Sequence, residues 1–291
     1  MIPSQRTSRG RGRRRPSRVS KFRAGVSAMA LFLWIGSVPA QETKPATPPA
    51  ADPKPATRPE SPSAPDAPTE TAAGRALLLE VVAACGGERL AALHTFRWKS
   101  RETRLLTSGG VVERDVEGTL QLPEERFRMD FEQGAQKSYY VVTEKGGWQR
   151  SPTSLQDFTE ALCTDFRRNL RTSTTPLLRA HAELVAQELP LEVLAGKEYR
   201  ILRVWRGTDG PVDLFIDPDD LTISRRRSSV VVNGQVVVRE EKLWDYRVVD
   251  GLKLPFARSM YDDGKNVATI TTIQYTLNVP IPEGHFDRPS G

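Results

Sequence analysis

Cysteine and histidine are scarce in this chain, which has two cysteines and three histidines in 291 residues. So little cysteine excludes a disulfide-dense scaffold, and so few histidines exclude most multi-ligand zinc sites. His94, His181 and His285 are far apart in the sequence, so a structural role is expected for each. The sequence also lacks the HExxH, GxSxG, P-loop and GxGxxG motifs. The residues therefore predict no enzyme, no metal site and no cofactor.

Acidic residues are absent from residues 1–40, which carry eight arginines and one lysine. The formal charge of the whole chain is +6, so the remaining 251 residues carry −3. The basic balance and the pI of about 9.4 therefore belong to one terminus. A mildly acidic remainder does not indicate a nucleic-acid-binding protein.

Long apolar runs are also missing. The run at residues 24–36 has about 13 residues, whereas a bilayer span needs about 20. It follows the basic stretch and precedes the small residues 37–40, which is the order of a secretory signal peptide. We predict cleavage after Ala40 and a soluble periplasmic protein, with an uncleaved anchor as the alternative. A twin-arginine signal or a nucleic-acid tail fits this order less well, and no cysteine near Ala40 is available for lipid attachment.

Proline is concentrated in residues 41–72, which contain nine prolines among Ala, Thr and Ser. Such a segment cannot bury a core, so we expect an extended disordered linker. It either holds the domain away from a surface or is simply tolerated. Residues 73–291 are long enough to form one domain with its own core.

Periodicity predicts a mostly β domain. A helical pattern at 74–85 ends at Gly86-Gly87, and a short helix follows at 88–94. The period then changes from 3.6 to 2, and Phe127, Met129 and Phe131 alternate with charged residues. Similar strand patterns are predicted at 96–106, 111–122, 138–144, 199–206, 212–216, 221–227, 230–232, 236–246, 252–261 and 267–277.

Two helices, at 154–170 and 176–184, interrupt the series of predicted strands. Short turns such as Asn233-Gly234 join the other strands, which is typical of an antiparallel meander. The predicted fold class is mostly β (α+β): a curved antiparallel sheet forming an incomplete barrel, with an N-terminal helix and an inserted helical lid or plug.

Two features have both a structural and a functional interpretation. Asp217, Asp219 and Asp220 could hold a cation, but they lie between predicted strands, so a turn is favoured. Cys85 and Cys163 lie on predicted helices and could form a disulfide worth about 4 kcal/mol. Each also fits as a small buried hydrophobic residue, which is the interpretation we favour.

Large apolar side chains are frequent on the predicted strands. Ordinary core packing is the usual reason, but some strands are apolar on both faces, as where Tyr139 and Val141 alternate with Tyr140 and Val142. Protein covering both faces would explain this, and so would an apolar ligand on one of them. Nine residues are ranked as candidate ligand-binding residues: Trp98, Phe127, Met129, Phe131, Tyr140, Trp148, Trp205, Trp244 and Phe256.

The order of elements resembles the periplasmic lipoprotein carriers LolA and LolB over most of residues 74–289. Short signatures carry the resemblance, together with the Gly86-Gly87 helix end and the helical insertion. They are Gly-Thr-Leu-Gln-Leu-Pro at 118–123 with Arg-Phe-Arg at 126–128, Gly-Gly-Trp at 146–148, Phe-Ile-Asp-Pro at 215–218, Asp-Tyr-Arg-Val-Val-Asp-Gly-Leu-Lys-Leu-Pro at 245–255, and Asn-Val-Pro-Ile-Pro at 278–282 with Phe286.

This resemblance implies an apolar cavity under a helical lid, in which acyl chains bind. The implied function is a non-catalytic carrier of a lipid or lipoprotein in the Gram-negative envelope, in contact with the membrane only transiently. The alternative is a sensor or interaction domain that binds an envelope protein. One position departs from the pattern: the soluble carrier has a lid-latching arginine immediately before the proline of the first signature, and this chain has Leu122. The resemblance therefore does not supply a latch.

Overall fold

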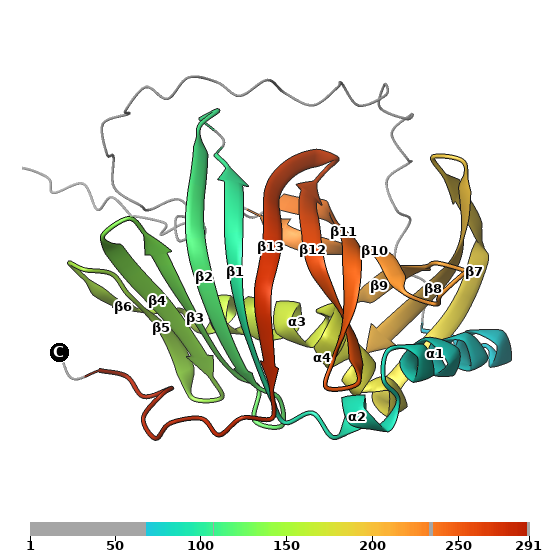
Figure 1. The fold of residues 1–291 in the computed structure, drawn as a ribbon, viewed down its shortest axis with the longest axis horizontal. Helices are drawn as coiled ribbons and strands as arrows, with labels where there is room; N and C mark the ends of the chain where they lie inside the picture. The colour runs from blue at the N-terminus through green and yellow to red at the C-terminus, as the bar shows by residue number, and fades with distance from the viewer. Residues whose placement is uncertain (1–67, 107, 233–234, 290–291) are drawn as a thin grey trace, which may run out of the picture.

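The computed structural model describes residues 68–106, 108–232 and 235–289 (Figure 1). The predicted signal peptide at 1–40 and residues 41–67 of the predicted linker lie outside the described residues. Within the described ranges, no helix is long and apolar enough to cross a membrane.

Thirteen antiparallel strands form one strongly curved sheet (Figure 1). The strands are β1 (Thr95–Leu105), β2 (Val111–Gln121), β3 (Arg126–Gln133), β4 (Gln136–Thr143), β5 (Gly146–Arg150), β6 (Leu155–Asp157), β7 (Leu184–Leu194), β8 (Lys197–Arg206), β9 (Pro211–Ile216), β10 (Ile223–Val232), β11 (Gln235–Val249), β12 (Leu252–Asp262) and β13 (Lys265–Leu277). Their order is β6-β5-β4-β3-β2-β1-β13-β12-β11-β10-β9-β8-β7. Because β6 and β7 do not pair, the barrel is incomplete, and the predicted fold class is confirmed.

The chain enters the sheet in its middle. From β1 it runs outward to the edge strand β6, re-enters at the opposite edge strand β7, and returns to β13, which pairs with β1. Joining the two edges requires a long crossover over one face of the sheet. The helices of this crossover lie inside the curve, behind β1, β13 and β12 in Figure 1.

The described residues form four short α-helices. They are α1 (Ala72–Ala84), α2 (Glu88–Ala91), α3 (Glu160–Arg171) and α4 (Thr174–Arg179), with a 3₁₀ turn at His181–Glu183. α1 starts two residues earlier than predicted because the Thr71 side chain accepts a hydrogen bond from the Gly74 amide at 3.0 Å.

For the helix predicted at 154–170, the predicted first residue was wrong. Residues Leu155–Asp157 form β6 because they pair with β5, and Thr159 then caps α3 by accepting from the Leu162 amide at 3.3 Å. The second predicted helix, 176–184, is shorter, and its last residues enter β7. β5 and β7 were not predicted as strands.

The main core lies between the concave face and the helices. Leu77 and Val81 of α1 and Leu177 of α4 are fully buried against strand residues such as Leu202 and Leu214. Each such side chain contributes about 1.5–3 kcal/mol on burial. α1 also packs directly on the edge strand β7 and protects that edge.

Gly74 makes this close approach possible. A Cβ atom at Gly74 would lie 2.5 Å from the carbonyl oxygen of Ala186 in β7. The Thr71 amide donates to the same oxygen at 3.0 Å, so the start of α1 is hydrogen-bonded to the edge strand.

The C-terminal segment, residues 278–289, covers the outer face of β4 and β5. Phe286 packs there against Val141 and Trp148 in a second, small core. This packing explains why β4 is apolar on both faces: Tyr140 points toward the main core, whereas Val141 faces the C-terminal segment. Protein covers both sides of this strand.

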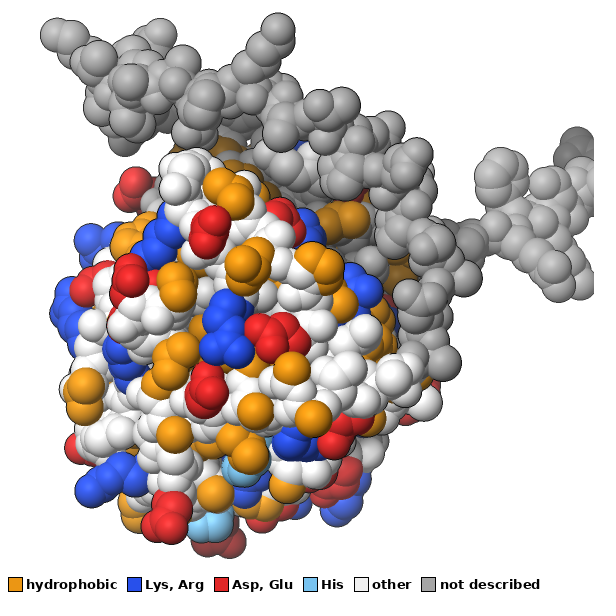
Figure 2. All heavy atoms as spheres, turned by 90° about the vertical axis from the view of Figure 1, so that its right-hand side faces the viewer, with side chains coloured by type: hydrophobic (Ala, Val, Ile, Leu, Met, Phe, Trp, Pro, Cys, Tyr) orange, Lys and Arg blue, Asp and Glu red, His pale blue; other side chains and the backbone are white. Residues whose placement is uncertain are grey.

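Charges of both signs are mixed on the face that carries α1 and β7. Figure 2 shows acidic and basic side chains next to one another there, with hydrophobic side chains scattered between them. Arg200 of β8 pairs with Glu80 at 3.1 Å and with Glu188 at 3.0 Å. This face is therefore a solvated surface and not a patch of one charge.

We expect Phe286→Ala to lower the free energy of unfolding by about 3 kcal/mol, because it removes a buried ring from the second core. Ile273→Ala is the control; Ile273 is 60% exposed on β13, and its loss should change stability by less than about 0.5 kcal/mol. Urea unfolding followed by tryptophan fluorescence measures both. Equal effects would show that the C-terminal segment does not hold the outer face.

Candidate functional site

Aromatic side chains form a continuous row of ring contacts on the concave face, which we call the aromatic row. In order of contact it comprises Phe256, Tyr275, Phe96, Trp98, Phe127 and Tyr140, with Phe131, Phe158 and Phe166 around Tyr140. Ring centroids are 4.9–6.3 Å apart, the range in which aromatic pairs attract. The sheet and the crossover together build this row.

Six of the nine candidate ligand-binding residues lie at the aromatic row. Five belong to it: Trp98, Phe127, Phe131, Tyr140 and Phe256. Met129 joins them because its Sδ accepts the Tyr140 hydroxyl at 3.1 Å. These six residues come from β1, β3, β4 and β12, and the alternation of side chains along each strand places them on the same face of the sheet.

The three remaining candidates lie away from the aromatic row. Trp148 is on the outer face, against Phe286. Trp205 alternates along β8 with the core residue Val204 and so points to the opposite face. Trp244 is 44% exposed.

The helices α3 and α4, which we call the lid, lie on the concave side, and α3 contacts the row at its Tyr140 end. Phe166 of α3 stacks on Phe158 at 5.4 Å and lies 4.9 Å from Tyr140. Cys163, one turn earlier, is buried against Gly147 of β5, where a Cβ atom would lie 3.2 Å from its sulfur. Phe158 and Phe166 were not among the predicted site residues, although the amphipathic pattern of residues 160–171 could have indicated Phe166.

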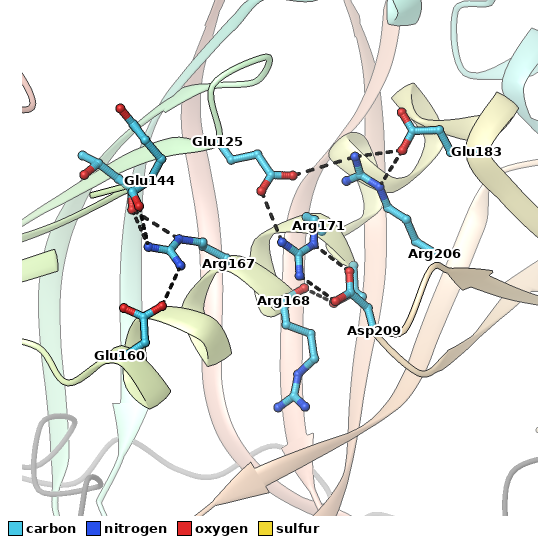
Figure 3. Close-up of polar contacts among 11 residues, drawn as sticks. Glu125, Glu144, Glu160, Arg167, Arg168, Arg171, Glu183, Arg206 and Asp209 are labelled. Carbon is cyan, nitrogen blue, oxygen red and sulfur yellow. Dashed lines mark hydrogen bonds and ion pairs between the residues drawn. The ribbon is translucent and has the colours of Figure 1, made fainter. Parts of the chain in front are cut away.

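Ion pairs attach the lid to both halves of the sheet (Figure 3). Arg171, the last residue of α3, binds Asp209 of the β8–β9 turn through two hydrogen bonds of 2.6 and 2.7 Å. The same guanidinium lies 3.2 Å from Glu125 in the β2–β3 turn. Arg206 also reaches Glu125, at 3.8 Å, and pairs with Glu183 at 3.2 Å.

A second attachment lies farther toward the start of α3. Arg167 donates to the carbonyl oxygen of Thr143, at the end of β4, at 2.7 Å, and it pairs with Glu160 at 3.4 Å. Arg168 points away from this network in Figure 3 and pairs with Asp165 within the helix. Two of three neighbouring arginines therefore hold the lid.

Arg171 makes the ionic attachment of α3 to the sheet that Leu122 cannot make. Leu122 is buried in the main core, and its amide donates to the His94 carbonyl at 2.9 Å. The hydrogen bonds to Asp209 raise the pKa of Arg171 above its ordinary value, so the latch stays charged. In this chain the cation is on the lid and the carboxylates are on the sheet.

A small cavity and a larger cleft lie next to the lid helices. The cavity below α4, lined by residues such as Cys85, Leu178 and Tyr246, measures about 10 Å³. That volume has room for no more than one water molecule. A cleft of about 540 Å³ lies beside Lys145, Trp148 and Phe286. Directly below α4, therefore, helix and sheet are packed together.

Burial keeps the aromatic hydroxyls and the thiols in their neutral forms. It raises the pKa of Tyr140 and Tyr246 above the ordinary value for tyrosine. It also raises the pKa of Cys85 to about 11 and that of Cys163 above its usual range. Both cysteines are free thiols, packed at different places in the fold, so the disulfide that the sequence left open is not formed in the structure.

The aspartates at 217–220 form the turn between β9 and β10. Lys197 binds Asp217 at 2.7 Å and Asp219 at 3.0 Å, and Lys253 binds Asp220 at 2.9 Å. Lysines thus occupy the place that a cation would take. Over the described ranges, no group of three His, Cys, Asp or Glu side chains could hold a metal ion.

Comparison with known proteins supports the fold. No protein-family model matches the chain, and no curated protein matches it. A DUF1329 family protein from Desulfovibrio piger superimposes with a TM-score of 0.53 at 12% identity, over 75% of this chain and 98% of that chain. A LolA superfamily protein from Nitrosomonas europaea gives a TM-score of 0.49 at 12% identity, over 74% of this chain and 98% of that chain. The predicted LolA/LolB-like fold is confirmed, and identities this low show the fold alone.

We expect Arg171→Met to increase opening of the lid. Amide hydrogen exchange in α3 should be about tenfold faster, because a charge-assisted, bidentate attachment is lost. Arg168→Met is the matched control, since Arg168 pairs only within its own helix among the interactions described. Equal exchange in the two variants would show that the ion pairs do not hold the lid.

Proposed function

We propose that this protein is a non-catalytic carrier of the cell envelope that binds acyl chains of a lipid or lipoprotein between the lid and the aromatic row. The observation that carries this proposal is the aromatic row itself. Most of its rings belong to the sheet, and Phe166 belongs to α3, a helix that ion pairs attach to the sheet. An apolar surface with a detachable cover is the requirement for taking up and releasing an apolar ligand.

The energies allow the lid to be displaced by cargo. Each buried CH₂ group contributes about 0.8 kcal/mol, so about ten of them would contribute about 8 kcal/mol. A hydrogen bond to a charged group contributes about 1.5–3 kcal/mol. Burial of one acyl chain therefore exceeds the loss of the Arg171 attachment, and the remainder is available to replace the contacts of Phe166 with Tyr140.

The predicted signal peptide assigns this carrier to the periplasm, where acylated molecules move between membranes. The linker at 41–72 would separate the domain from a surface. The proposed site is built from described residues between Phe96 and Tyr275, so the binding proposal can be tested on the purified protein.

Native mass spectrometry of protein purified from an envelope fraction tests the proposal. The wild type should carry bound acylated molecules. Phe166→Asp places a carboxylate against the apolar row and should reduce the bound fraction at least about tenfold. Trp244→Asp, on the exposed side of β11, is the matched control and should retain the cargo.

Circular dichroism and thermal unfolding must show that both variants are folded. A wild-type protein that is consistently empty would overturn the proposal. An empty protein that retains one envelope protein in stoichiometric amount would support the sensor or interaction domain instead.

A further inference from the structure

Charged side chains form a second feature of the concave face, next to the aromatic row. The strand register places Arg114, Glu102, Ile270, Arg258 and Leu243 in one row across β2, β1, β13, β12 and β11. The next row holds Arg104, Ala268, Met260, Glu241 and Arg226 across β1, β13, β12, β11 and β10. We call their charged members, Glu102, Arg104, Arg114, Arg226, Glu241 and Arg258, the inner charged band.

The inner charged band is on the same face as the aromatic row. On β1, Ser100 and Glu102 continue the alternation of Phe96 and Trp98, and side chains two apart in a strand point to one face. The guanidinium of Arg114 lies 4.1 Å from the ring centre of Phe131. Charged and aromatic side chains are therefore neighbours on this face.

Most charges in the band are buried and paired. Glu102, with 6% of its side chain exposed, lies 2.6 Å from Arg104 and 2.7 Å from Arg114. Arg226, with 5% exposed, pairs with Glu241 at 3.1 Å. Burial by itself would raise the pKa of Glu241, but Arg226, Arg258 and Arg239 keep it below the ordinary range.

Arg258 differs from the rest of the band. It is half-buried and makes no hydrogen bond or ion pair with any residue that the structure describes. Its register with Leu243 and Ile270 places it on the concave face, in the middle of the band. A half-buried guanidinium without an ion pair has donors left for an anionic ligand.

Three other polar atoms on the concave face also lack partners in the described part of the chain. The Nε atom of Arg226, the hydroxyl of Ser100 and the indole nitrogen of Trp98 are buried and have no hydrogen-bond partner among the described residues. Buried donors without acceptors destabilise a protein, so an acceptor that reaches this face would be bound favourably. A carboxylate or phosphate has the charge and the acceptor oxygens to bind there.

We propose that the inner charged band, with Arg258 at its centre, binds the anionic headgroup of the acyl ligand, a carboxylate or a phosphate, while the chain lies along the aromatic row. This inference rests on the proposed carrier function and names its ligand class, an anionic amphiphile. Arg258 and Phe256 are two residues apart on β12, which places charge and ring about 7 Å from each other along the strand.

Fluorescence titration with cis-parinaric acid and with its methyl ester tests the proposal, because the two probes share a chain and differ in charge. The wild type should bind the acid at least about tenfold more tightly than the ester. Arg258→Met should weaken binding of the acid about tenfold or more and leave the ester unchanged. Arg258→Lys should retain most of the preference.

Arg101→Met is the matched control, since Arg101 lies on the outer face of β1 and its side chain is 64% exposed. It should change neither affinity. Inorganic phosphate alone, measured by calorimetry, should bind at least about a hundredfold more weakly than the acid. Phosphate binding as tight as that of the acid would overturn the amphiphile in favour of a free anion.

Equal binding of acid and ester by the wild type, or an Arg258→Met variant that keeps the preference, would overturn the headgroup site and leave the carrier function standing. Failure of both probes to bind would overturn the carrier function and, with it, the headgroup site. Thermal unfolding of each variant confirms that a loss of binding does not come from loss of the fold.

Discussion

A chain that leaves a thirteen-stranded sheet at one edge and re-enters it at the other has to cross one of the two faces. Here the crossover from β6 to β7 passes over the concave face, and α3 and α4 lie within it. The sheet curves around these helices and cannot close, because they occupy its interior. The contact between Phe166 and Tyr140 and the salt bridge between Arg171 and Asp209 both result from this crossover. The lid is thus a consequence of the topology and not an addition to it.

Both apolar and ionic contacts attach the lid to the sheet. The apolar contacts come from Leu177 and Leu178 of α4 and from Cys163 of α3, which are buried, and from Phe166, which is partly buried. Under the proposed function, an acyl chain would replace the contact of Phe166 with Tyr140. The ionic contacts of Arg171 are partly buried, since 26% of the Arg171 side chain and 9% of Asp209 are exposed. A bidentate pair of this kind fixes the position of the lid helix relative to the β8–β9 turn.

Much of this architecture could be predicted from the sequence, and the exceptions have a common physical reason. The alternation of Phe127, Met129 and Phe131 is local, and it correctly indicated one face of a strand. The outward position of Trp148 depends on Phe286, which is far away in the sequence, so no local pattern could show it. The partner of Arg171 is likewise 38 residues away, in another turn. β6 was missed because three residues carry too little periodicity to compete with a helical pattern.

The concave face is divided between rings and charges, and this division limits what can bind there. A purely apolar ligand would leave the donors of Arg226 and Ser100 without acceptors. A purely ionic ligand would make no apolar contact with the aromatic row. On β1, Trp98 belongs to the row and Glu102 to the band, and on β12 the same holds for Phe256 and Arg258. The same strands therefore carry both surfaces, and the two surfaces adjoin each other. The proposed ligand, with an anionic head and an apolar chain, matches both surfaces.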